Sequence, residues 1–299
     1  MSTVPGVAAV TGASGYLGSR ICQTLEGRGW QVIRLVRTPK PGDSQERRYD
    51  LSRPLSPGLL ESVDLLVHTA YDFSLTSRAS IWRVNVDGAR RLLAAADEGG
   101  VRRILVLSTM SAYEGTKQLY GQAKLAIEEA TTAVGGCPIR PGLVYGSQPG
   151  GMAGALRKVT RLPLVPLISP NALQYPVLEE DLLMSIGALA EAKELPRDPI
   201  GIAQPTPIRF QDLLVAFAAQ EGRRCRFVRV PWRIVYWGLR AAELVRVRLP
   251  FRADSLLGLV RPAPLVPGVE DLARLGVRLT PFRAYTEDLG RAGGSHSRW

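Results

Sequence analysis

Histidine and cysteine are scarce in this chain of 299 residues. It has two histidines, His68 and His296, and three widely separated cysteines, Cys22, Cys137 and Cys225. The cysteines have neither the spacing of a metal site nor the even number of a disulfide framework, so we expect no bound metal. Free thiols are typical of a reducing compartment, which predicts a cytoplasmic protein.

Long apolar runs are absent as well. No stretch approaches the roughly 20 apolar residues that a membrane-spanning helix requires, so we expect no stable membrane insertion. No lysine or arginine precedes Arg20, so we expect no secretory signal at this end of the sequence. Hydrophobic residues nevertheless make up 45% of the chain, which excludes a disordered protein and predicts a globular one.

Lysine is also rare: only five of the 38 basic residues are lysines, and the formal net charge is +11. The arginines are spread along the chain rather than gathered in a tail, which favours a bias in composition over a nucleic-acid interface. We therefore expect no specific nucleic-acid partner. One segment, residues 232–249, mixes aromatic and basic side chains. Its pattern fits a helix packed on its own domain or, alternatively, a basic helix at a membrane surface.

Short apolar runs alternate with helical patterns in the first half of the chain. Strands are expected at residues 7–11, 31–36, 47–49, 63–69, 103–107 and 137–140, and helices at 16–27, 78–96 and 120–134. This alternation predicts a doubly wound parallel sheet, an α/β fold of the Rossmann type.

Prolines and glycines become frequent after Gly142, and the alternation ends there. We therefore place a first domain at residues 1–142, to which later segments can add strands. A smaller C-terminal lobe follows at residues 143–299. Its last residues, 293–299, are expected to fray.

A glycine-rich loop, T-G-A-S-G-Y-L-G, follows the first expected strand and opens the first helix. Gly12 allows a tight turn, Gly15 lets backbone N–H groups approach a pyrophosphate, and Gly18 lets the helix pack against the strand. The N-terminus of the helix then attracts the anion. The spacing predicts a dinucleotide site, with further contacts from Ser14, Tyr16 and Leu17.

The end of the second expected strand indicates which dinucleotide is bound. An acidic residue there would bind the ribose of NAD, but the sequence reads R-L-V-R and has no acidic residue before Asp43. The guanidinium of Arg37 can pair with a 2′-phosphate. We therefore favour NADP, with NAD as the alternative; an exposed arginine without a ligand is the simplest other interpretation.

Tyr120 and Lys124 form a Y-x-x-x-K pattern at the start of the third expected helix, where the spacing places both side chains on one face. A free phenol has a pKa of about 10. A neighbouring ammonium stabilises the phenolate, so Tyr120 can give or take a proton near neutral pH. A hydroxyl cluster precedes the pair, and Thr109 or Ser111 can polarise a substrate carbonyl, although strand-end capping explains at least one of the cluster's hydroxyls.

Together with these motifs, several further segments resemble the extended short-chain dehydrogenases/reductases, the NAD-dependent epimerase/dehydratase family. Asp50-Leu51 resembles the family's adenine-contacting pair, and His68-Thr69-Ala70 resembles its H-x-A-A segment beside the cofactor. Residues 84–93 resemble its N-V-x-G-T helix with the following L-L. Residues 139–146, which include Pro141, resemble the R-P-x-x-V-Y-G strand that lies against the nicotinamide.

The resemblance implies that Tyr120 is the acid–base residue, that Lys124 binds the nicotinamide ribose, and that a serine or threonine assists, for which we favour Thr109. It also implies that residues 1–142 form an NAD(P)-binding domain, that the lobe at residues 143–299 is the substrate-binding lobe, and that the protein forms a homodimer. Cofactor contacts are implied for Asp50, Leu51, Thr69, Ala70 and Pro141. One segment departs from the family: its R-x-F-x-H-V-x-D pattern reads L-Q-Y-P-V-L-E-E-D at residues 173–181, without the arginine and histidine. This difference argues against a typical binding site for the diphosphate of a nucleotide sugar.

The sequence favours an NAD(P)-dependent oxidoreductase that moves a hydride between nicotinamide and a small-molecule secondary alcohol or ketone. An NAD-dependent epimerase or dehydratase acting on a nucleotide sugar would use the same residues without net redox change. A non-catalytic cofactor-sensing protein is the third alternative, and the intact pair of Tyr120 and Lys124 argues against it.

Overall fold

The computed structural model describes residues 5–147, 150–245, 247, 252–261 and 263–282. The chain divides into two compact units. The first contains residues 1–140, 183–201 and 267–277, and the second contains residues 141–182, 202–266 and 278–299. Two segments from the second half of the chain thus join the first unit. The tail at residues 293–299, expected to fray, lies outside the described residues.

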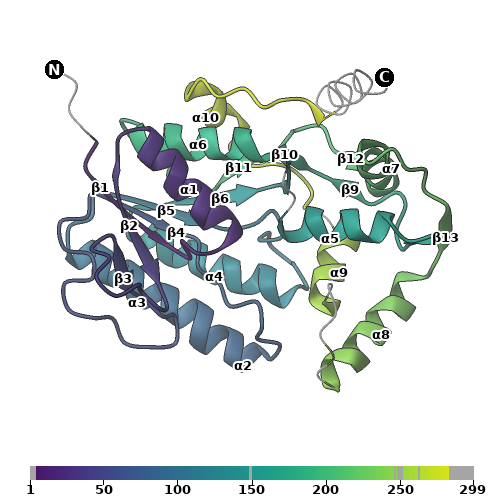
Figure 1. Ribbon diagram of the computed structural model, residues 1–299, viewed down its shortest axis with the longest axis horizontal. Helices are drawn as coiled ribbons and strands as arrows, with labels where there is room; N and C mark the ends of the chain where they lie inside the picture. The colour runs from purple at the N-terminus through teal and green to yellow at the C-terminus, as the bar shows by residue number, and fades with distance from the viewer. Residues whose placement is uncertain (1–4, 148–149, 246, 248–251, 262, 283–299) are drawn as a thin grey trace. The chain divides into compact units, whose positions relative to one another are not determined.

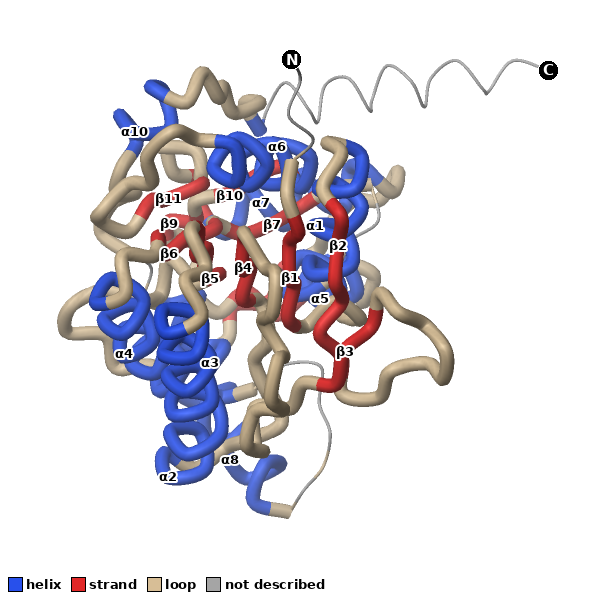
Figure 2. Tube along the Cα trace, turned by 90° about the vertical axis from the view of Figure 1, so that its left-hand side faces the viewer, coloured by secondary structure: helices blue, strands red, loops and turns tan. Residues whose placement is uncertain are grey.

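A seven-stranded sheet forms the centre of the first unit, with the strand order β11-β6-β5-β4-β1-β2-β3 (Figures 1 and 2). The strands are β1 Val7–Thr11, β2 Gln31–Val36, β3 Glu46–Arg48, β4 Leu65–His68, β5 Arg103–Leu107, β6 Cys137–Pro141 and β11 Ile200–Ile202. From β3 to β6 every neighbouring pair is parallel. The doubly wound Rossmann-type α/β fold is therefore confirmed.

Helices cover both faces of this sheet (Figure 2). They are α1 Tyr16–Gly27 and α6 Glu179–Glu191 on one face, and α3 Asp87–Glu98 and α4 Leu119–Ala133 on the other. Leu66 and Val106 of the sheet pack with Leu92 of α3 and Ile127 of α4 in one buried cluster. Because both faces are covered, β4 is buried along its whole length, as the continuous apolar run in the sequence predicts.

The chain reverses its direction of travel across the sheet between β1 and β4. From β1 it proceeds outward through β2 to β3, and then returns to β4 on the other side of β1. In open α/β sheets, ligands bind at such a switch point, beyond the carboxyl ends of the strands. The loops after β1 and β4 are therefore the expected place for a dinucleotide.

The helix expected at residues 78–96 is interrupted. It comprises α2 Arg78–Ile81, a π-helical segment η1 at Trp82–Val86, and then α3. Such π-turns are frequent at functional sites because the extra residue redirects side chains. The other helix of the first unit is the short α10, Val269–Arg274.

The second unit contains three two-stranded sheets, β10-β7, β12-β9 and β13-β8. Its strands are β7 Leu143–Tyr145, β8 Val165–Leu167, β9 Leu173–Gln174, β10 Pro176–Leu178, β12 Ile208–Arg209 and β13 Phe227–Arg229. Its helices are α5 Gly151–Thr160, α7 Phe210–Gln220, α8 Trp232–Leu244 and α9 Ala253–Val260. Tyr145, Leu156, Leu213 and Phe217 meet in a core that is separate from the core of the first unit.

Candidate active site

The glycine-rich loop after β1 has the geometry of a phosphate cradle. Gly12 has a φ of +66°, a left-handed conformation that glycine adopts without strain. The N–H of Gly15 donates to the Gly12 carbonyl at 2.8 Å and closes the turn. A Cβ atom at Gly18 would overlap the same carbonyl oxygen, so only glycine lets α1 approach the end of β1 this closely.

The start of α1 suits an anion. Ser14 and Gly15 are exposed at the tip of the loop, and Tyr16 and Leu17 are half-buried behind it. Gly15 is the N-cap and offers no side-chain cap, and the first turn contains no acidic residue. The first turn of α1 thus has no carboxylate of its own at the positive end of the helix dipole, and the loop fits the pyrophosphate of a dinucleotide.

Thr11 ties the ends of β1 and β4 together. Its hydroxyl oxygen accepts the N–H groups of Thr69 at 3.0 Å and Ala70 at 3.1 Å, while the Thr69 hydroxyl donates to the Thr11 carbonyl at 2.6 Å. The Thr11 hydroxyl then has its own hydrogen left for His68 Nδ1, which lies 2.8 Å away. These bonds place Thr69 and Ala70 beside the glycine loop.

His68 is consequently a neutral, structural histidine. Because Nδ1 accepts from Thr11, the ring hydrogen belongs on Nε2, which is buried and has no hydrogen-bond partner among the residues that the structure describes. Burial, with a smaller effect from Lys124, lowers the pKa of His68 to about 3. The side chain therefore stays uncharged near neutral pH and does not serve as an acid or base there.

Tyr120 and Lys124 lie in the first turns of α4. The Lys124 ammonium nitrogen is 6.0 Å from the centre of the Tyr120 ring and 5.0 Å from that of Tyr71. It donates to the Leu107 carbonyl at 2.5 Å. Only 3% of Lys124 is exposed, and this burial lowers its pKa to about 8, against the opposing effect of Glu128. A buried cation is thus held beside the phenol ring.

Two aromatic residues that sequence reasoning did not single out surround Tyr120. The ring centres of Tyr71 and Phe73 lie 5.0 Å and 5.5 Å from that of Tyr120, and 4.9 Å from each other. Both belong to the loop after β4, directly beyond Thr69 and Ala70. Phe73 is 60% exposed, so this cluster presents an apolar surface next to the phenol.

Asn85, in η1, fixes the loop that carries these rings. Its side-chain oxygen accepts the N–H of Asp72 at 2.7 Å, and its side-chain nitrogen donates to the Asp72 carbonyl at 3.2 Å. Asn85 is 1% exposed. The Asp72 carboxylate in turn accepts from the N–H and hydroxyl of Ser74. The backbone between Tyr71 and Phe73 is therefore held from both sides.

The hydroxyl groups that follow β5 lie in two different environments. Ser108 is buried and donates its hydroxyl to Glu128, so it belongs to the interior. Thr109 and Ser111 are both half-buried, and the Ser111 N–H donates to the Thr109 hydroxyl oxygen at 3.2 Å. A Cβ atom at Gly121 would overlap the Ser111 carbonyl oxygen, so the glycine after Tyr120 allows α4 to begin against this loop.

An ion pair between Arg140 and Glu128 lies one helical turn beyond Lys124. Arg140, at the end of β6, donates two bonds to Glu128, at 2.6 Å and 2.9 Å. Glu128 lies one helical turn beyond Lys124 and raises its pKa. Sequence reasoning did not identify this pair, although the i,i+4,i+8 spacing of Tyr120, Lys124 and Glu128 was a usable signal. Pro141 follows directly and ends β6.

Arg37 and Asp50 lie near each other beyond β2 and β3. Arg37 is exposed, and its charge contributes to lowering the pKa of Asp50, after the larger effects of hydrogen bonds from Ser52. Leu51 is buried. A Cβ atom at Gly88 would lie 2.5 Å from the Leu51 carbonyl oxygen, so the glycine of the N-V-D-G segment brings α3 against this loop.

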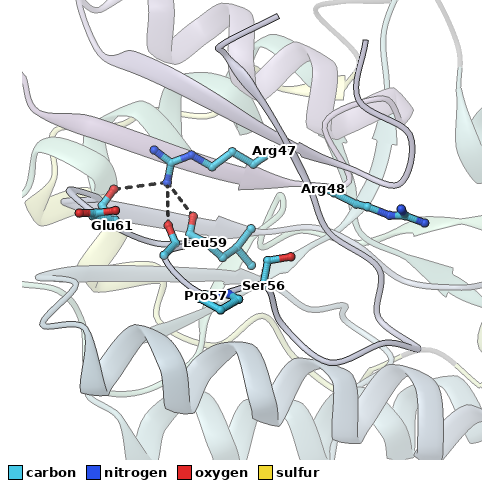
Figure 3. Close-up of a pocket in the computed structure, with 7 residues that line it drawn as sticks. Arg47, Arg48, Ser56, Pro57, Leu59 and Glu61 are labelled. Carbon is cyan, nitrogen blue, oxygen red and sulfur yellow. Dashed lines mark hydrogen bonds between the residues drawn. The ribbon is translucent and has the colours of Figure 1, made fainter. Parts of the chain in front are cut away.

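A hollow of about 440 Å³ lies beside β3 (Figure 3). One guanidinium nitrogen of Arg47 donates to the carbonyls of Gly58, Leu59 and Glu61 at 3.3, 2.8 and 3.3 Å. Arg48 points away from this group. Because the guanidinium of Arg47 is used in these bonds to the loop, we interpret the hollow as structural and do not take it as the candidate site. Across the described ranges, no three histidine, cysteine or acidic side chains are placed to hold a metal.

Comparison with known proteins identifies the family of the chain. The model of the NAD-dependent epimerase/dehydratase family matches residues 8–162. The chain is 26% identical over 235 residues to the ceramide reductase of Caulobacter vibrioides, covering 76% of this chain and 74% of that protein. It is 24% identical over 172 residues to a 3-beta-hydroxysteroid dehydrogenase of Mycolicibacterium neoaurum, covering 46% and 47% of the two chains.

Solved structures share the fold. The UDP-glucose 4-epimerase of Thermus thermophilus, in complex with NAD, superimposes with a TM-score of 0.70 and 21% identity, covering 95% of this chain and 96% of that one. The terminal R domain of the myxalamid biosynthetic pathway gives a TM-score of 0.74 and 17% identity, with 99% and 92% covered. Since the family model spans more than half of the chain, this protein belongs to the NAD-dependent epimerase/dehydratase family, whose members are enzymes of the short-chain dehydrogenase/reductase type.

Proposed function

We propose that this enzyme reduces a ketone, or oxidises a secondary alcohol, with Tyr120 as the residue that exchanges the proton. One observation carries the proposal: the buried ammonium of Lys124 lies 6.0 Å from the Tyr120 ring. A buried positive charge beside the phenol favours the phenolate over the phenol. A phenolate stabilised in this way can accept a proton, and the phenol can return it, as general acid–base catalysis requires.

The residues of the first unit fit a nicotinamide dinucleotide, which supplies or accepts the hydride when bound. Gly12, Gly15 and the start of α1 would hold its pyrophosphate, with Ser14, Tyr16, Leu17 and Gly18 forming the loop around it. Asp50 and Leu51 would contact the adenosine. Lys124 would bind the nicotinamide ribose, and the remaining contacts would come from Thr69, Ala70 and Pro141.

Proton transfer follows from the arrangement of the side chains. In the reducing direction, the Tyr120 hydroxyl gives its proton to the carbonyl oxygen of the substrate. In the oxidising direction, the phenolate takes the proton of the alcohol, and Lys124 stabilises the negative charge while it exists. Thr109 is our choice as the hydroxyl that donates to the substrate oxygen, with Ser111 as the alternative.

NADP is the cofactor that we favour. Arg37 is exposed at the end of β2, where a guanidinium can bind a 2′-phosphate in a bidentate manner. NAD binding is common to the family and stays the alternative.

An apolar substrate fits the surroundings of Tyr120 best. The exposed ring of Phe73 and that of Tyr71 offer apolar contacts, and the relatives named for ceramide and for a hydroxysteroid act on lipids. Residues 173–181 lack the arginine and histidine expected for a nucleotide-sugar grip. Epimerisation of a nucleotide sugar therefore ranks second.

A kinetic comparison of substrates tests this function. Purified protein is mixed with NADPH or NADH and a steroid ketone, a long-chain ketone or UDP-glucose, and cofactor oxidation is followed by absorbance. We expect turnover with an apolar ketone, reduced at least about hundredfold by Tyr120→Phe because the proton donor is lost. Tyr236→Phe, the same change in the second unit, serves as the control. Equal activity of the Tyr120→Phe variant and the wild type would overturn the assignment and favour the cofactor-sensing alternative.

A further inference from the structure

Helix α8 has an apolar surface that the fold leaves open. None of its residues is buried, although it contains two tryptophans, a tyrosine and several aliphatic residues. Trp237 is 68% exposed and Leu244 is 85% exposed, and Ile234 and Val245 are similarly open. At 3.6 residues per turn, these four side chains fall within an arc of about 100°. We call this surface the α8 face.

The other side of α8 faces its own unit. Glu243 is the only acidic residue of this helix, all of whose residues are described. Its carboxylate accepts the N–H of Ala253, at the start of α9, at 2.9 Å and pairs with Arg240 at 3.2 Å and Arg252 at 3.9 Å. Trp232 and Tyr236 are half-buried on this side as well. The acidic side chain of α8, Glu243, thus lies on the packed side, and the α8 face carries no negative charge of this helix.

Positive charge borders the α8 face. Arg233 and Arg240 lie along one edge of the apolar arc, and both are exposed. Arg229, the last residue of β13, is exposed shortly before the helix. Over residues 222–262 the sequence contains ten arginines and two acidic residues. This stretch of the sequence therefore has a surplus of eight positive charges.

An apolar helix face with tryptophan and an arginine border matches the chemistry of an anionic bilayer surface. Apolar side chains enter the boundary between headgroups and acyl chains, and the guanidinium groups pair with lipid phosphates. A second copy of the chain is a poorer occupant, because a two-fold contact through this face would bring arginines against arginines. No helix in the described part of the chain is long and apolar enough to cross a membrane, so binding would be peripheral.

We propose that α8 is an interfacial helix, and that its α8 face docks the second unit onto membranes containing anionic phospholipid. This proposal is independent of the reaction catalysed at Tyr120. It rests on the exposure of Ile234, Trp237, Leu244 and Val245, on the arginine border, and on the placement of Glu243 on the opposite side.

Vesicle flotation with the full-length protein tests the proposal. One set of vesicles contains phosphatidylcholine alone, and the other contains about 30% phosphatidylglycerol, which gives a negative surface potential. We expect flotation with the anionic vesicles only. The double variant Ile234→Gln/Trp237→Gln should lose at least about tenfold in partitioning, since two apolar contacts are removed. Arg233→Gln should lose about fivefold, and this loss should shrink at high salt.

Val215→Gln is the matched control, because Val215 is also an exposed aliphatic residue on a helix of the second unit. It should float like the wild type. Helical circular dichroism and NADPH binding, measured on every variant, show that the fold is retained. Absence of flotation with anionic vesicles would overturn the proposal, and so would equal flotation of the double variant. A wild-type dimer in light scattering that the double variant does not form would overturn it in favour of self-association.

Discussion

The side chain of Asn85 bonds to both polar groups of the Asp72 backbone, at 2.7 Å to its N–H and 3.2 Å to its carbonyl oxygen. The two residues are 13 positions apart, in a π-helical turn and in the loop after β4. Because Tyr71 and Phe73 flank Asp72 and contact Tyr120, a residue remote from the phenol sets the shape of its surroundings.

Replacing Asn85 tests this positioning role. Asn85→Ala removes both hydrogen bonds and leaves the half-buried backbone groups of Asp72 without this partner, which costs about 1 kcal/mol of stability. We expect kcat/KM for an apolar ketone to fall at least about tenfold, mainly through KM, because the Tyr71–Phe73 loop loses its support. Asn171→Ala, at an exposed turn, is the control for stability by chemical denaturation and for steady-state kinetics. Unchanged kinetics in Asn85→Ala would show that the loop keeps its shape without this bond.

The buried charge of Lys124 is expected to lower the stability of the fold and to support activity. Its pKa is lowered to about 8 by burial, whereas an unfolded lysine titrates near 10.4. Below pH 8 the lysine is charged in both states, and the full cost of burying the charge is present. As the pH rises from 8 toward 10.4, the folded protein loses this proton first, and the cost disappears.

The variant Lys124→Met should therefore be more stable than the wild type at pH 7, by up to about 3 kcal/mol if the lost hydrogen bond to Leu107 is neglected. Its advantage should shrink as the pH rises above 8, and its activity should be lost. Urea denaturation at pH 7, 8.5 and 10 measures this. The matched control is Lys117→Met, because Lys117 is an exposed lysine near the start of the same helix. A stability difference that grows with pH would contradict the interpretation.

Replacing each of two glycines of α1 by alanine compares the effect of close packing with the effect of helix propensity. Gly18→Ala places a methyl group against the Gly12 carbonyl, so it should displace the loop, lower the melting temperature and weaken NADPH binding at least about tenfold. Gly27→Ala, at the other end of the helix, meets no atom within 4 Å and should be neutral or stabilising by up to about 1 kcal/mol. Calorimetry and fluorescence titration measure both. Equal melting temperatures and NADPH affinities of the two variants would contradict the proposal that the glycine-rich loop binds the pyrophosphate.

Arg37 decides between the two cofactors in our proposal. Loss of a charge-assisted bond to a 2′-phosphate costs about 1.5–3 kcal/mol, so Arg37→Ala should weaken NADPH binding by roughly tenfold to hundredfold and leave NADH binding nearly unchanged. Arg48→Ala, an exposed arginine on the neighbouring strand β3, controls for the general loss of positive charge. The assignment fails if NADPH and NADH bind the wild type equally well.

Patterns that are local in the chain were predictable from the sequence. The glycine-rich loop, the alternation of strands and helices, and the Y-x-x-x-K spacing each depend on neighbouring residues, whose backbone geometry places them together in any Rossmann-type fold. The parallel sheet and the family are therefore confirmed. The roles of Tyr120 and Lys124 stay predictions.

Only the tertiary structure decided the contacts between residues far apart in the chain. It placed Tyr71 and Phe73 against Tyr120, and it left the hydrogen of His68 on a buried nitrogen because Thr11 uses the other one. Residues 183–201 and 267–277 likewise join the first unit through contacts across the chain. Periodicity reports which side of an element is buried, but the partner on that side depends on how all the elements pack.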